Sequence, residues 1–439
     1  MFFKKKTTDQ EDATMIAVRS ATNRKDIVTG TNGKQKKQPY YFEHEGVQYE
    51  IKENRVIIAL FVAPRRAGKT TLMTSMWHEA RKNMGDGFAM EPYRMADYQR
   101  DELLKNLEDM ISNTHLPRFE SGVAPSNSLE VYNFIIYHKD HPRVCYMLRF
   151  IDVPGEWVSQ HEDAMKLLIS ESDILYFPLS APALLENQGD WNEEFNATQT
   201  IINLSNVFNA DDIAKRSRLI LFVPVKCEKY YWQMISGAND NSMMALNQLV
   251  SERYKPLIDA VQCNEDLKND TVIAITPILT SGGQKFYQFV TLKDENGNEF
   301  HADTYVRDFT YVSPADPFRP TFCEQPLLYT LCFLKNGIEN YIRKSGMKGF
   351  FNDAQQSGIG TAFHYAFTDP LCEEIIDRTR IADFAAFQSA DDFRKTEAEN
   401  GSVAERKYPI GLYTNVETLG YSVVYDPQSL YGQKQEERK

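Results

Sequence analysis

Apolar residues along the chain gather in short runs, and segments with helical periodicity lie between these runs. The strongest run is Val56–Ala63, VIIALFVA, and similar runs cover Asp173–Leu179, Arg218–Val225 and Thr271–Ile278. A continuous apolar run of strand length is typical of a strand buried on both faces of a parallel sheet. The helical patterns lie at 70–83, 97–113, 161–171, 194–209 and 242–262. Strands that alternate with helices predict an α/β fold with a mostly parallel central sheet.

Two further patterns predict antiparallel hairpins. Leu129–His138 and Val144–Val153 are β-like runs joined by the polar sequence KDHPR. A second hairpin is expected around DENGNE at 294–299, where it interrupts the α/β pattern before a helix near Gln325–Arg343. Polar turn residues between two β-like runs are the usual signal for such a connection. The second hairpin is therefore predicted to be an insertion.

The two ends of the chain differ from its middle. Residues 1–40 are polar and lack apolar periodicity, and Lys and Arg outnumber Asp and Glu there, so we predict a mobile basic arm. This arm is either a solvated tail or a contact for an anionic membrane or a nucleic acid. Residues 41–345 hold the alternating pattern and are predicted to form the main domain. Residues 346–439 mix short helical and extended pieces and are predicted to be a C-terminal extension.

Composition narrows the class of protein further. The 439 residues are 42% hydrophobic, enough for a sizeable core, and no apolar run is long enough to span a membrane. The six cysteines are scattered without a CxxC pair, which fits a reduced compartment and argues against a zinc site or a disulfide scaffold. The N-terminal sequence lacks the pattern of a secretory signal, so we expect a cytoplasmic protein. A net charge of -12 makes nucleic acid an unlikely main partner.

The turn after the first buried strand carries a phosphate-binding pattern. Residues 63–70 read APRRAGKT, which fits [AG]xxxxGK[ST] with alanine in the first position. Backbone N–H groups of such a turn, together with the positive end of the following helix, form a nest for phosphate. Gly68 is expected to approach the β-phosphate, Lys69 to reach the β- and γ-phosphates, and Thr70 to ligate Mg²⁺. The predicted binding residues of this loop are Ala63, Arg65, Arg66, Ala67, Gly68, Lys69, Thr70 and Thr71.

Two arginines within this loop are unusual, and two interpretations stay open. Arg65 and Arg66 can supply positive charge to the transition state from within the same chain, as an arginine finger does, which makes Arg66 a catalytic candidate. Alternatively, both side chains face solvent or bind a partner protein.

A second motif follows the predicted hairpin. Residues 148–157 read LRFIDVPGEW, and the strand is expected to end at Asp152. A carboxylate there can hold Mg²⁺ through a water molecule. DVPG has the form DxxG, in which the Gly155 N–H bonds the γ-phosphate, and this form is typical of GTP switches rather than of most ATPases. The two motifs together predict a nucleotide-binding switch.

The DVPGEW block and the upstream RRAGKT loop resemble the YcjX-like and double-GTPase families of bacterial P-loop GTPases, over about residues 50–340. The resemblance implies a Ras-like fold, GTP and Mg²⁺ as ligands, and slow hydrolysis gated by a switch. It also implies a setting in a bacterial stress response or conflict system.

Glu156 occupies the place where many small GTPases carry a water-positioning glutamine. Its carboxylate can orient the attacking water, but it also repels the γ-phosphate, so we expect slow turnover that a protein activator or effector accelerates. The alternative is that Glu156 faces solvent in the switch segment. Thr114 is a candidate for the Mg²⁺-binding switch threonine, which we expect between residues 112 and 128.

Guanine recognition normally uses [NT]KxD after a later strand, and here the strand runs into Val225-Lys226-Cys227-Glu228. The stem of Lys226 can lie over the base, and Glu228 can accept hydrogen bonds from guanine N1 and N2. Val225 departs from the family pattern and removes one polar contact. Ser281 lies shortly after the last predicted strand, where a loop N–H would meet the guanine carbonyl. The site is therefore predicted to prefer guanine over adenine.

Three functions fit these motifs. The first is an enzyme that hydrolyses the β–γ bond of GTP, with Lys69, Mg²⁺ and backbone amides stabilising charge. The second is a nucleotide-gated interaction module that binds GTP and hardly hydrolyses it. The third is a P-loop ATPase or kinase, against which DVPG and the Lys226–Glu228 turn argue.

Overall fold

The computed structural model describes residues 8–29, 35–64, 67–83, 88–120, 128–138, 142, 145–189, 191–192, 197–210, 218–238, 242–264, 267, 271–293, 299–310, 312–327, 330 and 422–425. Within these ranges no helix combines the length and the apolar character needed to cross a membrane.

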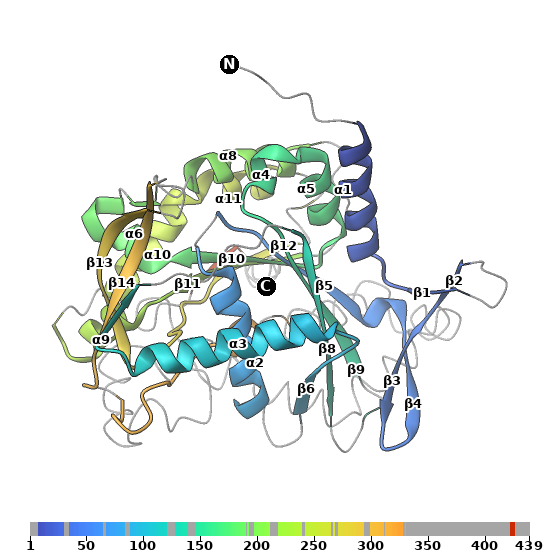
Figure 1. Ribbon diagram of the computed structural model, residues 1–439. Helices are drawn as coiled ribbons and strands as arrows, with labels where there is room; N and C mark the ends of the chain where they lie inside the picture. The colour runs from blue at the N-terminus through green and yellow to red at the C-terminus, as the bar shows by residue number, and fades with distance from the viewer. Residues whose placement is uncertain are drawn as a thin grey trace, which may run out of the picture.

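An eight-stranded sheet forms the centre of the molecule, in the order β15-β12-β11-β10-β5-β9-β8-β6 (Figure 1). The five neighbours from β12 to β9 pair in parallel, while β15, β8 and β6 join antiparallel. The strands are β5 (Val56–Phe61), β6 (Phe88–Pro92), β8 (Glu130–His138), β9 (Cys145–Asp152), β10 (Ile174–Ser180), β11 (Arg218–Val225), β12 (Thr271–Ile275) and β15 (Ser422–Tyr425). The predicted α/β class and the mostly parallel central sheet are confirmed.

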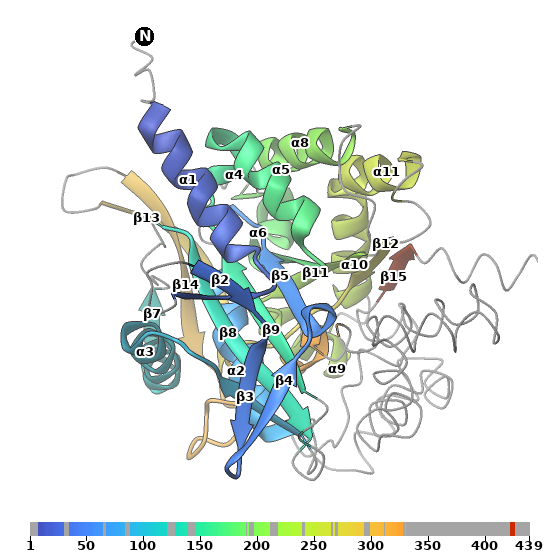
Figure 2. The same cartoon turned by 90° about the vertical axis from the view of Figure 1, so that its right-hand side faces the viewer.

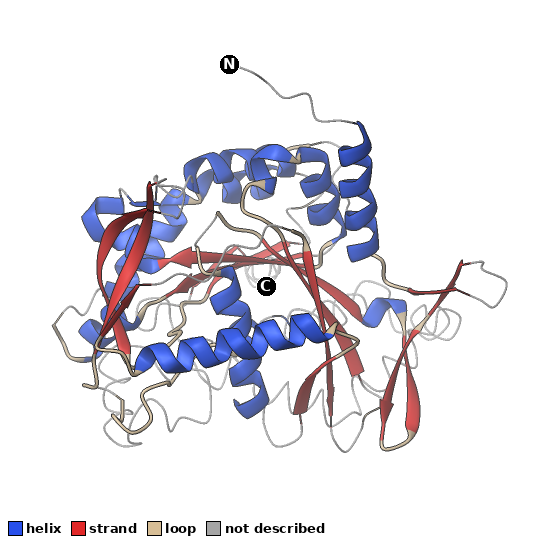
Figure 3. Ribbon diagram, viewed as in Figure 1, coloured by secondary structure: helices blue, strands red, loops and turns tan. Residues whose placement is uncertain are grey.

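Helices cover both faces of this sheet. Figure 1 shows α4, α5, α8 and α11 above the sheet, with α1 beside α5, and α2 and α3 below it. The helices are α1 (Thr8–Ala21), α2 (Lys69–Asn83), α3 (Asp97–Thr114), α4 (Trp157–Gln160), α5 (Glu162–Glu171), α6 (Ala181–Leu185), α8 (Ala197–Phe208), α9 (Glu228–Ile235), α10 (Ser242–Arg253) and α11 (Lys255–Cys263), with short 3₁₀ turns at Glu53–Arg55 and Glu186–Gly189. The layered arrangement is clear when helices and strands are coloured separately (Figure 3).

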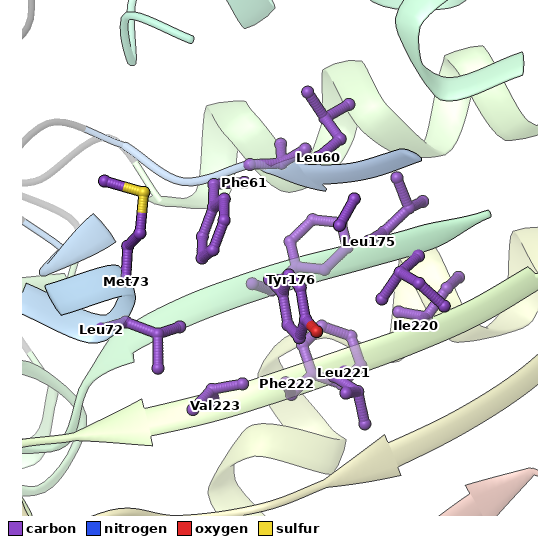
Figure 4. Close-up of a cluster of buried hydrophobic side chains, with 14 of the residues drawn as sticks. Leu60, Phe61, Leu72, Met73, Leu175, Tyr176, Ile220, Leu221, Phe222 and Val223 are labelled. Carbon is purple, nitrogen blue, oxygen red and sulfur yellow. The ribbon is translucent and has the colours of Figure 1, made fainter. Parts of the chain in front are cut away.

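The main core lies between the sheet and its helices. Every residue of β5, β10 and β11 is buried, which explains why these segments read as continuous apolar runs. In Figure 4, Phe61 of β5, Tyr176 of β10 and Leu72 of α2 lie in one cluster. The rings of Phe61 and Tyr176 stack with their centroids 4.9 Å apart. Burial of each such side chain contributes about 1.5–3 kcal/mol, so the first turn of α2 is fixed firmly against β5.

A smaller antiparallel sheet stands apart from the central one. It has the order β13-β14-β7, with β13 (Gln284–Lys293), β14 (Glu299–Arg307) and β7 (Arg118–Glu120). The hairpin expected around residues 294–299 is therefore confirmed, although its connection lies outside the described residues. β7, which follows α3 directly, completes the sheet along β14. A segment from the first third of the chain is thus joined to the inserted hairpin.

The segment predicted as a mobile basic arm, residues 1–40, contains ordered elements, so this part of the prediction is wrong where the structure describes it. Helix α1 buries Val18 and Ala21 in the main core. β1 (Asp26–Thr29) pairs with β2 (Gln35–Gln38), and a second hairpin, β3 (Tyr40–His44) and β4 (Val47–Ile51), projects beyond the sheet (Figure 2). Long-range contacts hold the helix: Arg149 of β9 donates hydrogen bonds to the carbonyls of Ala21 and Asn23.

Other expectations differ in detail. The helical pattern at 242–262 forms two helices, α10 and α11, because Pro256 stands in the first turn of α11 and cannot continue the preceding helix. The helix expected near residues 325–343 lies largely outside the described residues. Within the predicted extension, 346–439, residues 422–425 form β15 on the edge of the central sheet, while the proposed domain boundaries stay a prediction.

Candidate nucleotide site

The phosphate-binding pattern lies between the buried strand β5 and the N-terminus of α2, as its motif requires. The loop leaves the sheet after Phe61 and enters the helix at Lys69. Inside the loop the Ala67 N–H donates to the Pro64 carbonyl at 3.3 Å, and the Leu72 N–H donates to the Gly68 carbonyl at 2.8 Å. The first N–H groups of α2 have no partner within the helix, so a phosphate at this end meets donors and the positive end of the helix dipole.

Gly68 adopts a conformation that side chains rarely take, with φ at +98°. A Cβ atom built there would lie 2.9 Å from Cγ2 of Val225, the last residue of β11. Both the backbone conformation and the contact with β11 therefore require glycine at this position. The contact also joins the phosphate loop to the strand that leads into the predicted base-recognition turn.

Lys69 and Asp152 meet beneath this loop. The register between β5 and β9 places Asp152 beside Phe61, where the loop begins. The Lys69 ammonium lies 3.8 Å from Oδ1 of Asp152 and donates to the Ala63 carbonyl at 3.4 Å. Burial lowers the pKa of Lys69, while the charges of Asp152 and Glu156 act in the opposite direction. A buried ammonium next to a carboxylate can bind phosphate oxygens and a metal ion together.

The donor chemistry around Lys69 fits Mg²⁺. Thr70 lies in the first turn of α2 and is half-buried, and Asp152 is buried at the end of β9. A hydroxyl and a carboxylate are the hard oxygen ligands that Mg²⁺ takes from P-loop proteins, which leave the remaining positions to phosphate and water. Among the described residues no group of three or more His, Cys, Asp or Glu side chains forms a metal cage. Thr70 and Asp152 therefore fit a Mg²⁺ ion whose remaining ligands are phosphate and water.

The segment after Asp152 turns at once into a short helix. The Trp157 N–H donates to the Pro154 carbonyl at 3.0 Å, which places Gly155 and Glu156 in the turn before α4. Trp157 packs on the main core, and its ring lies 4.9 Å from that of His161. Gly155 and Glu156 are half-buried at the same end of the sheet as Lys69. The negative charge of Glu156 acts to raise the pKa of the Lys69 ammonium.

The two predicted base-recognition segments lie together. Glu228 begins α9, and its Oε1 accepts hydrogen bonds from the Ser281 N–H at 2.7 Å, the Ser281 hydroxyl at 3.1 Å and the Thr280 hydroxyl at 3.3 Å. Burial raises the pKa of Glu228, and the donors of Ser281 and Gly282 oppose that shift. Glu228 and Ser281 are 53 residues apart in sequence, so the fold has joined two loops that the motifs identified separately.

Lys226 makes contacts that the sequence did not suggest. Its ammonium is ion-paired with Asp303 on β14, and it lies 5.6 Å from the centre of the Tyr305 ring. The Tyr305 hydroxyl donates to the same carboxylate of Asp303. Asp303 and Tyr305 are two residues apart on β14 and so share a face. The strand, EFHADTYVR, also has a charged residue at each end, so its sequence did not single out Asp303. Their partner could not be read from the sequence, because the pair is 77 residues apart.

The remaining predicted residues give a mixed picture. Thr114 is fully buried at the end of α3, and its hydroxyl donates to the Ile111 carbonyl at 2.6 Å. This is the contact of a structural threonine and does not match a metal ligand. Thr71 lies half-buried in the first turn of α2. Arg65 and Arg66 fall outside the described residues, so their predicted roles stay predictions.

Comparison with known proteins gives only distant structural matches. No protein-family model matches the sequence, and no curated protein matches it either. The signal recognition particle receptor SRb-GTP/SRX complex from Chaetomium thermophilum is similar with a TM-score of 0.29 and 14% identity, over 52% of this chain and 92% of that chain.

Two further solved structures are similar at the same level. The LeoA bacterial dynamin GTPase from ETEC gives a TM-score of 0.28 and 13% identity, over 52% of this chain and 30% of that chain. The small COPII coat GTPase SAR1 from Encephalitozoon cuniculi, in complex with GDP, gives a TM-score of 0.24 and 11% identity, over 62% of this chain and 76% of that chain. Similarity this distant establishes neither a family nor an activity, and the YcjX-like resemblance stays a prediction.

Proposed function

We propose that this chain binds GTP together with Mg²⁺ and hydrolyses it slowly, as a molecular switch. One observation carries the proposal: the loop between β5 and α2 brings the Lys69 ammonium to 3.8 Å from Asp152, at the end of the adjacent strand β9. An ammonium suited to phosphate and a carboxylate suited to a metal ion therefore lie at one end of the sheet, which supports the proposal. Ligands of open α/β sheets bind at the carboxyl ends of the strands, which is where both residues lie.

At the phosphate end, each proposed role follows from the type of side chain. The backbone from Ala63 to Thr71 surrounds the phosphates, and Lys69 neutralises charge on the β- and γ-phosphates. Thr70 and Asp152 hold Mg²⁺, which supplies charge stabilisation on the bridging phosphate oxygens when it is bound. The Gly155 N–H meets the γ-phosphate, so the turn before α4 senses whether that phosphate is present.

At the base end, Glu228 accepts hydrogen bonds from guanine N1 and N2 through Oε2, while the donors from Thr280 and Ser281 hold Oε1. The stem of Lys226 lies over the base, and the loop at Ser281 meets the guanine carbonyl. Adenine presents no matching donor pair to the carboxylate, which leaves a buried charge without compensation. Such a mismatch costs about 1–3 kcal/mol, enough to set the preference for GTP.

Turnover is proposed to be slow because a carboxylate replaces the usual water-positioning amide. Glu156 lies close enough to act on the charge of Lys69, so it also repels a γ-phosphate bound there. The same observation favours a second function, a nucleotide-gated interaction module with little hydrolysis. The proposal also includes Arg66 as a catalytic group, because of its position in the loop motif. It includes a protein effector or activator that accelerates turnover. The family resemblance adds a bacterial stress or conflict setting.

The test compares nucleotide binding in the wild type, Lys69→Ala and a matched control. Lys255→Ala removes an exposed lysine whose side chain is 68% accessible and which pairs with Asp259 one turn along its own helix. We expect wild type and Lys255→Ala to bind a fluorescent GTP analogue, with GTP competing far better than ATP, and Lys69→Ala to lose binding. Phosphate release measured on the same samples separates the switch from the module.

Each alternative gives a distinct result in this experiment. Normal GTP binding by Lys69→Ala would show that the loop does not hold the phosphates. Equal competition by ATP would remove the guanine assignment but leave the phosphate site. Tight GTP binding without turnover above buffer would favour the interaction module over the enzyme.

A further inference from the structure

Lys226 has an unusual backbone. Its φ is +64°, in the left-handed region, which a residue other than glycine enters at a cost of about 1–3 kcal/mol. Such conformations persist only where surrounding contacts hold them. The turn between β11 and α9 carries Lys226 and, two positions later, Glu228, the two residues proposed to recognise the base.

The contacts that hold Lys226 come from the inserted hairpin. Its side chain is 10% exposed and that of Asp303 is 4% exposed, and the two are ion-paired. Burial, and then the charge of Asp303, raises the pKa of Tyr305 well above the ordinary value, so the phenol stays protonated and donates to Asp303. A buried ion pair with an additional donor is costly to break from one side, because the remaining charge is left without compensation.

Asp303 itself is held on a rigid element. It lies on β14, the middle strand of the three-stranded sheet, where Phe289 of β13 is its cross-strand partner. On the other side, Tyr305 pairs with Phe119 of β7, and the two rings stack with centroids 5.0 Å apart. Strands on both sides therefore fix the position of the Asp303 carboxylate.

We propose that Asp303, supported by Tyr305, is a positioning residue for base recognition: it holds Lys226 in the left-handed turn, with its stem over the nucleotide base. This inference rests on the proposed function, since it assigns a role within the same site. It adds a group from outside both recognition loops and gives the inserted hairpin a function. Asp303 acts on the base through Lys226, while the phosphates are bound independently of it.

The test separates base binding from phosphate binding by isothermal titration calorimetry with Mg²⁺, using GTP and inorganic tripolyphosphate as ligands. For Asp303→Asn we expect GTP affinity to fall by about tenfold or more, the usual effect of losing a hydrogen bond to a charged group, and tripolyphosphate affinity to stay unchanged. Tyr305→Phe keeps the ring but removes the donor, and we expect a smaller loss of about threefold for GTP only.

Asp308→Asn is the matched control. Asp308 directly follows β14 and pairs with Lys285 at 2.6 Å, and its loss is expected to change neither affinity. If Asp303→Asn and Tyr305→Phe bind GTP as the wild type does, the inference is overturned. It is also overturned if either loses GTP and tripolyphosphate equally, because that result describes a purely structural pair. A wild type that binds tripolyphosphate but no GTP would instead remove the proposed function.

Discussion

The phosphate end of the proposed site is built from main chain, whereas the base end is built from side chains. Gly68 and Lys69 are placed by the passage from β5 to α2, and Asp152 by parallel pairing with β5. Lys226 is held by Asp303, and Glu228 by the loop at Ser281. The first set depends on neighbouring residues and one strand register. The second depends on contacts between segments more than fifty residues apart.

This difference has consequences for substitutions. The phosphate loop requires the left-handed backbone conformation of Gly68. A substitution that disturbs this conformation is therefore expected to weaken the binding of every ligand that carries phosphate. At the base end each side-chain contact contributes separately to affinity. Losing one contact is therefore expected to lower the affinity in part, and by an amount that differs between guanine and adenine nucleotides. The phosphate end and the base end meet where Gly68 packs against Val225, the last residue of β11.

The largest expected effect is at Gly68. Gly68→Ala adds a Cβ in a left-handed turn and 2.9 Å from Val225, so we expect a loss of roughly 100-fold in affinity for GTP and tripolyphosphate alike. Titration calorimetry of both ligands measures this. Gly68→Ala with Val225→Ala removes the close contact but keeps the strained φ, and we expect it to remain impaired. Full recovery in the double variant would mean that main-chain geometry is not the cause.

A change at Glu228 should separate the two ends. Glu228→Gln keeps the shape but removes the acceptor charge, so we expect GTP affinity to fall about tenfold while ATP affinity does not fall. Competition of GTP and ATP for a fluorescent analogue measures the ratio. Glu252→Gln, on the exposed side of α10, serves as the control; its carboxylate accepts a hydrogen bond from Gln248, four residues earlier on the same helix. A parallel loss of GTP and ATP in Glu228→Gln would contradict the division between base and phosphate ends.

The smallest expected effect is a pH dependence at the phosphate end. Burial lowers the pKa of Lys69 below the ordinary 10.5. A bound phosphate is expected to favour the charged form, because an opposite charge nearby raises the pKa of an ammonium. As pH rises through the lowered pKa, the free protein loses a proton that the complex keeps, so affinity falls by at most about tenfold per pH unit. Calorimetry between neutral and alkaline pH tests this. Lys69→Arg keeps its charge throughout, and its residual affinity should not decline in the same way.

The strand, the turn and the helix of the proposed phosphate end were predictable from the sequence for the same reason that substitutions there are expected to be poorly tolerated. Each of its features is local: a buried run, a glycine turn, a lysine at the start of a helix. The parallel strands were predictable because burial on both faces leaves uninterrupted apolar runs, as in β10 and β11. The antiparallel pair of β8 and β9 was predictable from two runs and a short polar turn.

The missed features depend on distant partners. Helix α1 has a polar sequence whose few apolar residues, such as Val18, form no clear stripe. Arg149, and Asp173 through its ion pair with Arg24, hold the segment from far along the chain. β7 is only three residues long and exists through its pairing with β14. Asp303 belongs to the site only because Lys226 reaches it. A single sequence contains no signal for such pairings, so the base end could be predicted only in part.

The edges of the central sheet determine how the molecule behaves toward copies of itself. On one edge β6 ends at Pro92, which has no N–H to offer another strand. On the other edge β15, from far along the chain, occupies the hydrogen-bonding groups of β12. A shortened chain without residues 422–425 would present β12 as an open template, and intermolecular strand addition, with aggregation at high protein concentration, is the consequence.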